Sequence, residues 1–205
     1  MQTKAAVLIK INQPLRILDL EIPRLKRGQV LVDVMYSGIC HSQLNEIHGL
    51  KGEDKFIPHT LGHEGSGIVL EVGEGVTKVK PGNHVVLTWI KGLGVDVPST
   101  IYQSSVGPVN SGAISTFMYN AVISENRLVS IPKNMPLREA ALLGCAIPTG
   151  AGIAINGGVT SINNCIIRDN FVGLNIYQLN GGAGILCGFN FSDTPLELSL
   201  SNSEI

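Results

Sequence analysis

Three residues of the kind that bind transition metals, Cys40, His63 and Cys145, lie close to glycines in a chain of 205 residues. Cys40 and His63 are 23 positions apart, and another 82 positions separate His63 from Cys145. Structural zinc sites usually use closely spaced ligands, whereas catalytic sites gather three distant ligands and leave one position open. If these residues bind one metal, the fold must therefore bring three remote turns together. The alternative is that the cysteines are small buried apolar residues and the histidine makes local hydrogen bonds.

Motifs around these residues follow one another in a distinctive order: Gly38–Ser42, Gly62–Val69, Val79–Val86, Ser124–Leu128 and Gly144–Gly150. Together they resemble the zinc-containing medium-chain alcohol dehydrogenases over roughly residues 1–155. The resemblance implies a mainly β fold, with a GroES-like β-barrel catalytic domain with a few helices at residues 1–155. A short β-rich tail, residues 156–205, would follow.

The resemblance also assigns roles to the metal-binding residues. Cys40, His63 and Cys145 would bind one catalytic zinc ion, and Glu64 would lie behind the metal as a second-shell or exchanging ligand. Zinc would polarise an alcohol and lower its pKa, so that a hydride can leave for the nicotinamide ring of NAD.

His41 and Ser42, which follow Cys40 directly, would complete the set of catalytic residues. Ser42 would start a proton relay, because a hydroxyl can both donate and accept a hydrogen bond. His41 would contact the cofactor pyrophosphate or extend the relay. Without the other motifs, the same two residues are equally well explained as the start of a helix, where serine is a common cap.

The chain departs from the family in two ways. Many members hold a second, structural zinc in a lobe with four cysteines, but residues 89–111 contain no cysteine, so no structural zinc is expected and a loop is predicted there. Members also continue into a Rossmann domain with a Gly-x-Gly-x-x-Gly turn. Only 55 residues follow Gly150, and the glycines of segment 181–188 have the wrong spacing. No complete Rossmann domain and no NAD-binding motif is predicted, and a truncated or fused chain is expected.

The tail has a different composition from the rest. After Gly150 the only basic residue is Arg168, and Asn and Gly alternate with aliphatic residues. This pattern weakly resembles a pectate-lyase-type parallel β-helix, with Cys165 stacked near Leu198 and Ile167 near Leu200. At most two coils are present where about three are needed. An open strand edge would then favour self-association, so a homo-oligomer is one expectation.

Overall composition excludes several classes of protein. A net charge of −1 without a basic stripe argues against nucleic-acid binding. The apolar run at residues 5–9 is too short for a secretory signal or a membrane span. Four cysteines, two of them assigned to a metal, favour a reducing cytoplasm over a disulfide framework.

Local composition predicts where the ligands lie. Strands are predicted at residues 4–10, 15–22, 29–37, 66–72, 84–89 and 116–123, and helices at 41–47 and 137–143. Cys40 then lies at a strand end, His63 in a loop entering a strand, and Cys145 just past a helix.

Two functions of different classes follow. The first is a zinc-dependent alcohol dehydrogenase that interconverts a small alcohol and its aldehyde with NAD, here without its nucleotide-binding domain. The second is a catalytically inactive metal-binding remnant or assembly module. A carbohydrate-active role for the tail has thin support, because Arg168 and Asp169 alone do not supply charged groups on several coils.

Overall fold

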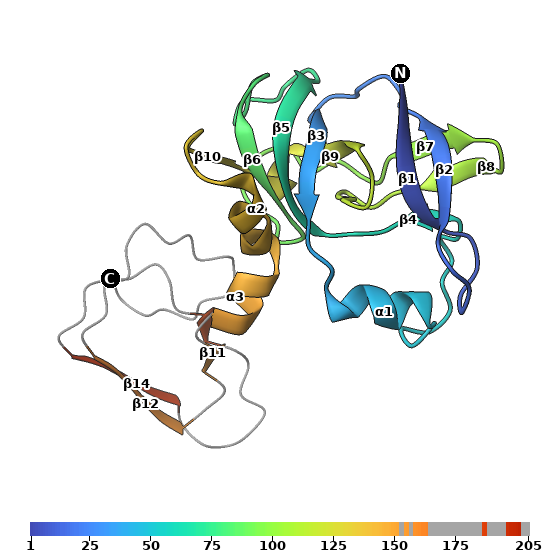
Figure 1. The fold of residues 1–205 in the computed structure, drawn as a ribbon. Helices are drawn as coiled ribbons and strands as arrows, with labels where there is room; N and C mark the ends of the chain where they lie inside the picture. The colour runs from blue at the N-terminus through green and yellow to red at the C-terminus, as the bar shows by residue number, and fades with distance from the viewer. Residues whose placement is uncertain (152–153, 156–157, 164–185, 188–195, 202–205) are drawn as a thin grey trace. The chain divides into compact units, whose positions relative to one another are not determined.

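The computed structural model describes residues 1–151, 154–155, 158–163, 186–187 and 196–201, in two compact units, Met1–Thr149 and Gly150–Ile205. The first unit is built mainly of strands, with a few short helices (Figure 1). Its strands are β1 (Gln2–Leu8), β2 (Arg16–Glu21), β3 (Gln29–Ser37), β4 (His59–Thr60), β5 (Glu64–Val72), β6 (His84–Thr88), β7 (Ile101–Ser104), β8 (Gly107–Asn110), β9 (Asn120–Ser124) and β10 (Leu128–Ile131). Its helices are α1 (His41–Ile47), the 3-10 turn η1 (Glu125–Arg127), α2 (Leu137–Ala140), the 3-10 turn η2 (Ala141–Gly144) and α3 (Ala146–Ala151), which runs into the second unit.

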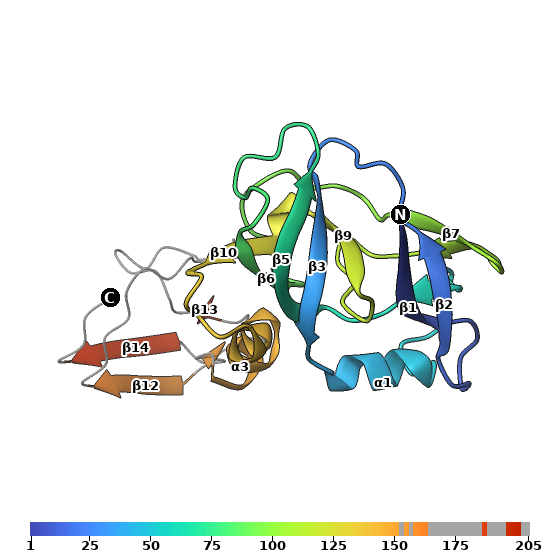
Figure 2. The same ribbon diagram turned by 45° about the horizontal axis from the view of Figure 1, so that its top comes forward.

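The strands form a closed barrel and a second sheet. The barrel order is β1-β2-β7-β8-β4, and the five-stranded sheet has the order β10-β6-β5-β3-β9. A bridge between Ala5 of β1 and Met118, just before β9, links the two. Figure 2 shows the strands of this unit from a second direction. The predicted fold class, a mainly β barrel domain with a few helices, is confirmed.

Burial follows the strand periodicity. Thr3, Ala5 and Val7 of β1 are buried and alternate with exposed Gln2 and Lys4, as expected for a strand with one face on the core. The central strand β3 lies between β5 and β9 and is buried continuously over residues 29–32. The core therefore lies between the barrel and the sheet. The C-terminal end of β3 and the N-terminal end of β5 lead into the segments that contain Cys40 and His63.

The loop predicted for residues 89–111 is wrong in part, because this stretch contains the hairpin β7–β8, which helps to close the barrel. Tyr102 and Val109 are partners in the hairpin register and are both fully buried. The Tyr102 hydroxyl accepts a hydrogen bond from the backbone N–H of Val122 at 2.8 Å. These two side chains anchor the lobe in the main core of the unit, which its polar and glycine-rich composition obscured.

Other boundaries also differ from the prediction. The strand expected at 116–123 begins only at Asn120, and the helix expected at 137–143 is α2 followed by the turn η2. The short strands β4 and β10 were not predicted. In contrast, the prediction for 29–37 and for helix 41–47 matches β3 and α1.

Glu125 attaches the cysteine-free lobe to the sheet. Its carboxylate is 1% exposed and accepts hydrogen bonds from the backbone N–H groups of Thr77 at 2.6 Å, Lys78 at 2.9 Å and Val95 at 2.7 Å. Burial alone would raise the pKa of Glu125, but these three hydrogen bonds and the charge of Lys78 outweigh burial and lower it. A charged hydrogen-bond acceptor thus holds the start of the lobe at Val95.

The Glu125→Gln variant should lower the free energy of unfolding by about 1–3 kcal/mol at pH 7, because an amide nitrogen faces backbone donors in place of an oxygen. Since the folded-state pKa of Glu125 is lowered, its contribution is present above the unfolded pKa and is lost as the pH falls through the folded value. Urea unfolding at pH 7 and in acid measures both effects. The exposed Glu74→Gln variant is the matched control, and equal stability of the two variants at pH 7 would contradict the assignment.

The second unit contains two parallel strand pairs. β11 (Ala154–Ile155) pairs with β13 (Leu186–Cys187), and β12 (Gly158–Asn163) pairs with β14 (Leu196–Ser201). In this pairing Leu198 lies opposite Thr160 and Leu200 opposite Ile162. The predicted partners, Cys165 and Ile167, lie outside the described residues. The uninterrupted six-residue strand β12 supplies the partner of β14, and the β-helix resemblance stays a prediction.

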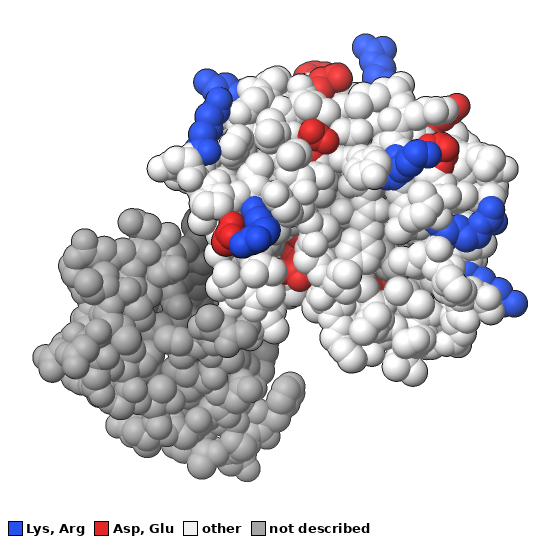
Figure 3. All heavy atoms as spheres, viewed as in Figure 1, with Lys and Arg blue, Asp and Glu red and all other residues white. Residues whose placement is uncertain are grey.

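On the face of the Met1–Thr149 unit drawn in Figure 3, basic and acidic side chains are dispersed among uncharged ones. Among the described residues, no helix has the length and apolar character needed to cross a membrane.

Candidate metal centre

The three predicted ligands lie at the ends of secondary-structure elements. Cys40 stands between β3 and the first residue of α1, His63 immediately precedes β5, and Cys145 lies between η2 and α3. The antiparallel pairing of β3 with β5 brings Ser37 opposite Gly65, so the chain segments that carry Cys40 and His63 leave the sheet side by side. The hydroxyl of Thr88 in β6 donates to the carbonyl of Gly144 at 2.7 Å and holds the Cys145 segment against the same sheet.

The donor atoms converge as a zinc site requires. The sulfur atoms of Cys40 and Cys145 are 3.9 Å apart, and Nε2 of His63 is 3.2 Å from the Cys145 sulfur. All three atoms lie within 4.8 Å of one another. Two sulfurs bound to tetrahedral zinc at the usual bond length are about 3.8 Å apart. The two thiols and one imidazole therefore fit a zinc ion with one open position.

The environment favours the metal-binding protonation states of two ligands. The neighbouring Ser42, first through its hydroxyl and then through its backbone N–H, lowers the pKa of Cys40 toward the thiolate form. Burial lowers the pKa of His63 and so favours the neutral ring, which has a lone pair to donate. Burial raises the pKa of Cys145, and the nearby Cys40 adds to this effect, as expected for two thiols that both need a cation to ionise.

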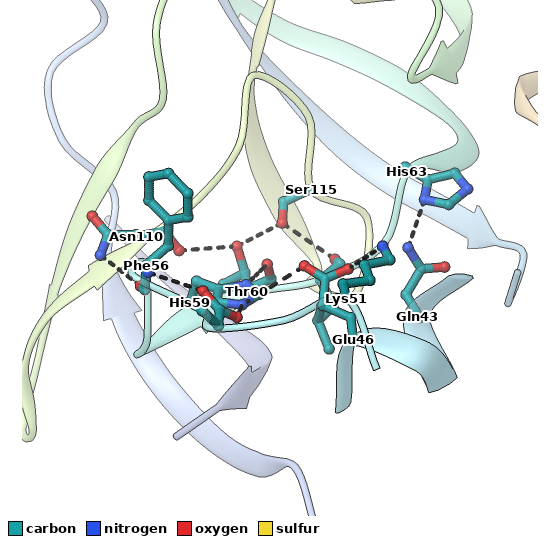
Figure 4. Close-up of polar contacts among 11 residues, drawn as sticks. Gln43, Glu46, Lys51, Phe56, His59, Thr60, His63, Asn110 and Ser115 are labelled. Carbon is teal, nitrogen blue, oxygen red and sulfur yellow. Dashed lines mark hydrogen bonds and ion pairs between the residues drawn. The ribbon is translucent and has the colours of Figure 1, made fainter. Parts of the chain in front are cut away.

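Gln43 orients the His63 ring, a role that the sequence analysis missed. It is 3% exposed, and its side-chain amide lies 2.5 Å from Nδ1 of His63 while also accepting from the backbone N–H of Cys40 at 3.3 Å (Figure 4). The Gln43 atom nearest the ring is Nε2, while its Oε1 accepts the Cys40 N–H. Metal binding at Nε2 of His63 places the ring proton on Nδ1, so the Gln43 amide would then turn its Oε1 toward the ring and give up the contact to Cys40. The signal was the position of Gln43 in the first turn of α1, three residues after Cys40.

Glu64 is buried beside the donors without being one of the three convergent atoms. It is 2% exposed, and its carboxylate accepts a hydrogen bond from the backbone N–H of Ala146 at 3.0 Å. A side chain on Gly38 would place its Cβ 2.5 Å from the Glu64 carboxyl carbon, and one on Gly144 would place it 2.9 Å from the Glu64 Cβ. Glycines at both positions therefore make room for this carboxylate.

Ser42 and His41 occupy different environments at the start of α1. The Ser42 hydroxyl oxygen is buried, and despite its proximity to Cys40 it makes no hydrogen bond of normal geometry within the described residues. His41 is exposed. An unpartnered buried hydroxyl two residues from a ligand is what a site for a hydroxyl-bearing substrate would provide.

Residues 26–133 match the model of the alcohol dehydrogenase GroES-like domain. This match covers more than half of the chain. The chain belongs to the zinc-containing medium-chain alcohol dehydrogenase family.

Relatives of the family are about a third identical to this chain over the aligned residues. The NDMA-dependent alcohol dehydrogenase of Amycolatopsis methanolica is 34% identical, over 90% of this chain and 56% of its own length. The S-(hydroxymethyl)glutathione dehydrogenase of Paracoccus denitrificans is 30% identical, over 94% and 59%. The crystal structure of an alcohol dehydrogenase zinc-binding domain protein from Burkholderia ambifaria superposes with a TM-score of 0.66 at 28% identity, over 80% of this chain and 53% of that one.

These matches reach further into this chain than the motifs indicated. The chain spans 56–60% of the length of the first curated relatives. Residues 1–155 are only about three quarters of the chain, so alignments that cover 90% or more of it must extend into the segment after residue 155. The alignments thus extend beyond the motifs that carry the resemblance, and the division at residue 155 into a catalytic domain and a tail stays a prediction.

The Gln43→Ala variant should bind zinc about 10–100-fold more weakly, because the His63 ring loses the group that fixes its orientation. Competition with a chromophoric chelator measures the affinity. Asn45→Ala on the same helix is the control, since no hydrogen bond of its side chain is found in the described structure. Equal zinc affinity in the two variants would exclude an orienting role for Gln43.

Proposed function

We propose that this chain supplies the zinc-binding, alcohol-orienting part of an NAD-dependent alcohol and aldehyde oxidoreductase, with residues 1–155 as its catalytic domain and 156–205 as its tail. The observation that carries the proposal is the convergence of Cys40, His63 and Cys145, with the buried and unpartnered hydroxyl of Ser42 nearby. Small alcohols and aldehydes are the proposed substrates, because the related enzymes are named as alcohol and S-(hydroxymethyl)glutathione dehydrogenases.

Cys40, His63 and Cys145 would hold the zinc ion, which when bound acts as a Lewis acid on the oxygen of an alcohol or aldehyde. Ser42 would accept the alcohol proton and pass it outward, since a hydroxyl can both accept and donate a hydrogen bond. Glu64, held by the backbone of Ala146 through one carboxylate oxygen, keeps the segments of His63 and Cys145 in place. It would be a ligand only if its carboxylate moved toward the three convergent donors.

His41 is the proposed contact to the cofactor. It lies at the first residue of α1 and is exposed, so its ring can reach a bound pyrophosphate without leaving a buried position. NAD is expected from the family, although the glycine segment 181–188 does not fit the usual motif. A cytoplasmic location is part of the same proposal.

A pocket of about 420 Å³ in the first unit offers room for a small substrate beside the metal centre. It is lined by His63 and Gln43 on one side and by Phe56, Leu61, Ile101 and Ile114 among others. Mixed apolar walls with a few polar groups are typical of small-molecule sites. The competing function, an inactive metal-binding remnant or assembly module, would retain the ligands without using this pocket.

Protein prepared without added metal should contain one zinc per chain, and the Cys40→Ser, Cys145→Ser double variant should contain none at this centre, because it lacks two of the three donors. Metal analysis by mass spectrometry measures this. Zinc retained by the double variant would overturn the assignment of the ligands.

Cobalt-substituted protein separates the dehydrogenase from the remnant. The visible absorption of cobalt(II) reports its ligands, so a primary alcohol that reaches the open position should change the spectrum. With NAD⁺ present, formation of the reduced nicotinamide by the zinc form should fall about 100-fold or more in Ser42→Ala, because the proton loses its first acceptor. A metal-loaded chain with no spectral change and no turnover would favour the remnant.

A further inference from the structure

A second group of side chains of the metal-ligand type lies outside the candidate zinc centre, and two of its members, Glu46 and His59, line the same pocket. Glu46 comes from the last turn of α1, Asp54 from the following loop and His59 from the first residue of β4. One ligand atom from each lies within 4.8 Å of the other two. Glu46 and His59 are labelled in Figure 4. The side chains of His59 and Asp54 are 8% and 13% exposed, and that of Glu46 is 27% exposed.

Each of the three side chains is held by one contact that leaves its other polar atom free to face the centre of the group. Asp54 accepts the backbone N–H of Phe56 on Oδ1 at 2.9 Å, and Glu46 accepts the ammonium of Lys51 on Oε2 at 3.0 Å. Asp54 Oδ2 and Glu46 Oε1 are left, and they lie 2.7 Å and 3.8 Å from Nε2 of His59. The three atoms come from three separately fixed residues.

The backbone determines which ring nitrogen of His59 carries a proton. Nδ1 lies 2.9 Å from the carbonyl oxygen of Thr60, which can only accept a hydrogen bond, so Nδ1 is the donor. In the neutral ring, Nε2 then points a lone pair at two carboxylate oxygens. Such an arrangement is repulsive unless a cation lies between them, and that cation is either a second proton on the ring or a metal ion. Metal-bound histidines usually donate their other ring N–H to a backbone carbonyl or a carboxylate, as Nδ1 of His59 does here.

We propose that Glu46, Asp54 and His59 form a second site, for a divalent cation that takes mixed oxygen and nitrogen ligands, such as Mn²⁺, Fe²⁺ or Zn²⁺. Neighbouring ligands of a six-coordinate ion of this size are about 3.0 Å apart, which lies between the two distances measured from His59. Two carboxylates and Lys51 give the group a net charge of −1 with His59 neutral, so a divalent ion is electrostatically favoured. The site contains no thiol and does not depend on the zinc centre or on the proposed function.

The remaining coordination positions of such an ion would face a pocket that His63 also lines. Three protein ligands leave positions for water or for an oxygen of a bound small molecule. A carboxylate, hydroxyl or phosphate group is therefore the chemical class of ligand that the second site would hold.

Manganese binding tests the proposal in the zinc-loaded full chain, because Mn²⁺ prefers oxygen ligands and competes poorly for two thiolates. Electron paramagnetic resonance should show one bound Mn²⁺ per chain. Asp54→Asn and His59→Gln should each weaken that binding at least tenfold while zinc content stays at one per chain. Asp19→Asn removes an exposed carboxylate that pairs with Lys4 on the barrel, and should leave Mn²⁺ binding unchanged.

The contrary result is an ion pair that needs no metal. Nitrogen-15 NMR of the His59 ring, recorded with excess Zn²⁺, distinguishes the metal site from the ion pair. In the metal site Nε2 is bound to the ion, and in the ion pair it is protonated. Protonation of both ring nitrogens under these conditions, or Mn²⁺ affinity equal in wild type and Asp54→Asn, would overturn the proposal. Unchanged zinc content in the variants shows that the barrel is folded, so loss of Mn²⁺ binding is then not a folding defect.

Discussion

The geometry of the candidate metal centre depends on the burial of one carboxylate at the junction of three chain segments. Glu64 begins β5 next to His63, and its carboxylate binds the backbone N–H of Ala146, next to Cys145. Its side chain fills the space that the absent Cβ of Gly38 leaves, two residues before Cys40. A buried carboxylate is costly unless its oxygens are paired, so the three turns cannot separate without exposing or orphaning it. Glu64 can therefore preserve the geometry of the ligands without being one of them.

Features that depend on local sequence could be predicted, whereas features that depend on tertiary contacts could not. Cys40, His63 and Cys145 are recognisable because each lies in a local motif, and α1 and β3 match their predicted limits because composition changes sharply at Gly38. The hairpin β7–β8 was missed because its two core residues, Tyr102 and Val109, are surrounded by serine, glycine and proline. Gln43 was missed because a polar residue on a helix is usually solvated, and only the fold places it against His63.

The tail shows the limit of composition as evidence of origin. Its asparagine and glycine content and its single basic residue suggested a separate piece, yet the similarity to dehydrogenases continues into it. Parallel strand pairing, as between β12 and β14, is common to β-helices and to nucleotide-binding sheets. Amino-acid composition reflects the local turns and strands of a segment, whereas an alignment compares residues position by position. For this tail, the alignment is the more informative of the two.

Helix α1 connects the zinc centre and the second group. Gln43 and Glu46 are three residues apart and so lie on one face of the helix, where the first contacts His63 and the second approaches His59. The helix has only seven residues, and the carbonyl of Ile47 at its end accepts the backbone N–H of Asn12 at 2.7 Å. A change in the charge around Glu46 would therefore act on the element that also orients His63. Occupation of the second site by a cation would neutralise Glu46 and Asp54. It would also fix the C-terminal end of α1, whereas Cys40 precedes the N-terminal end.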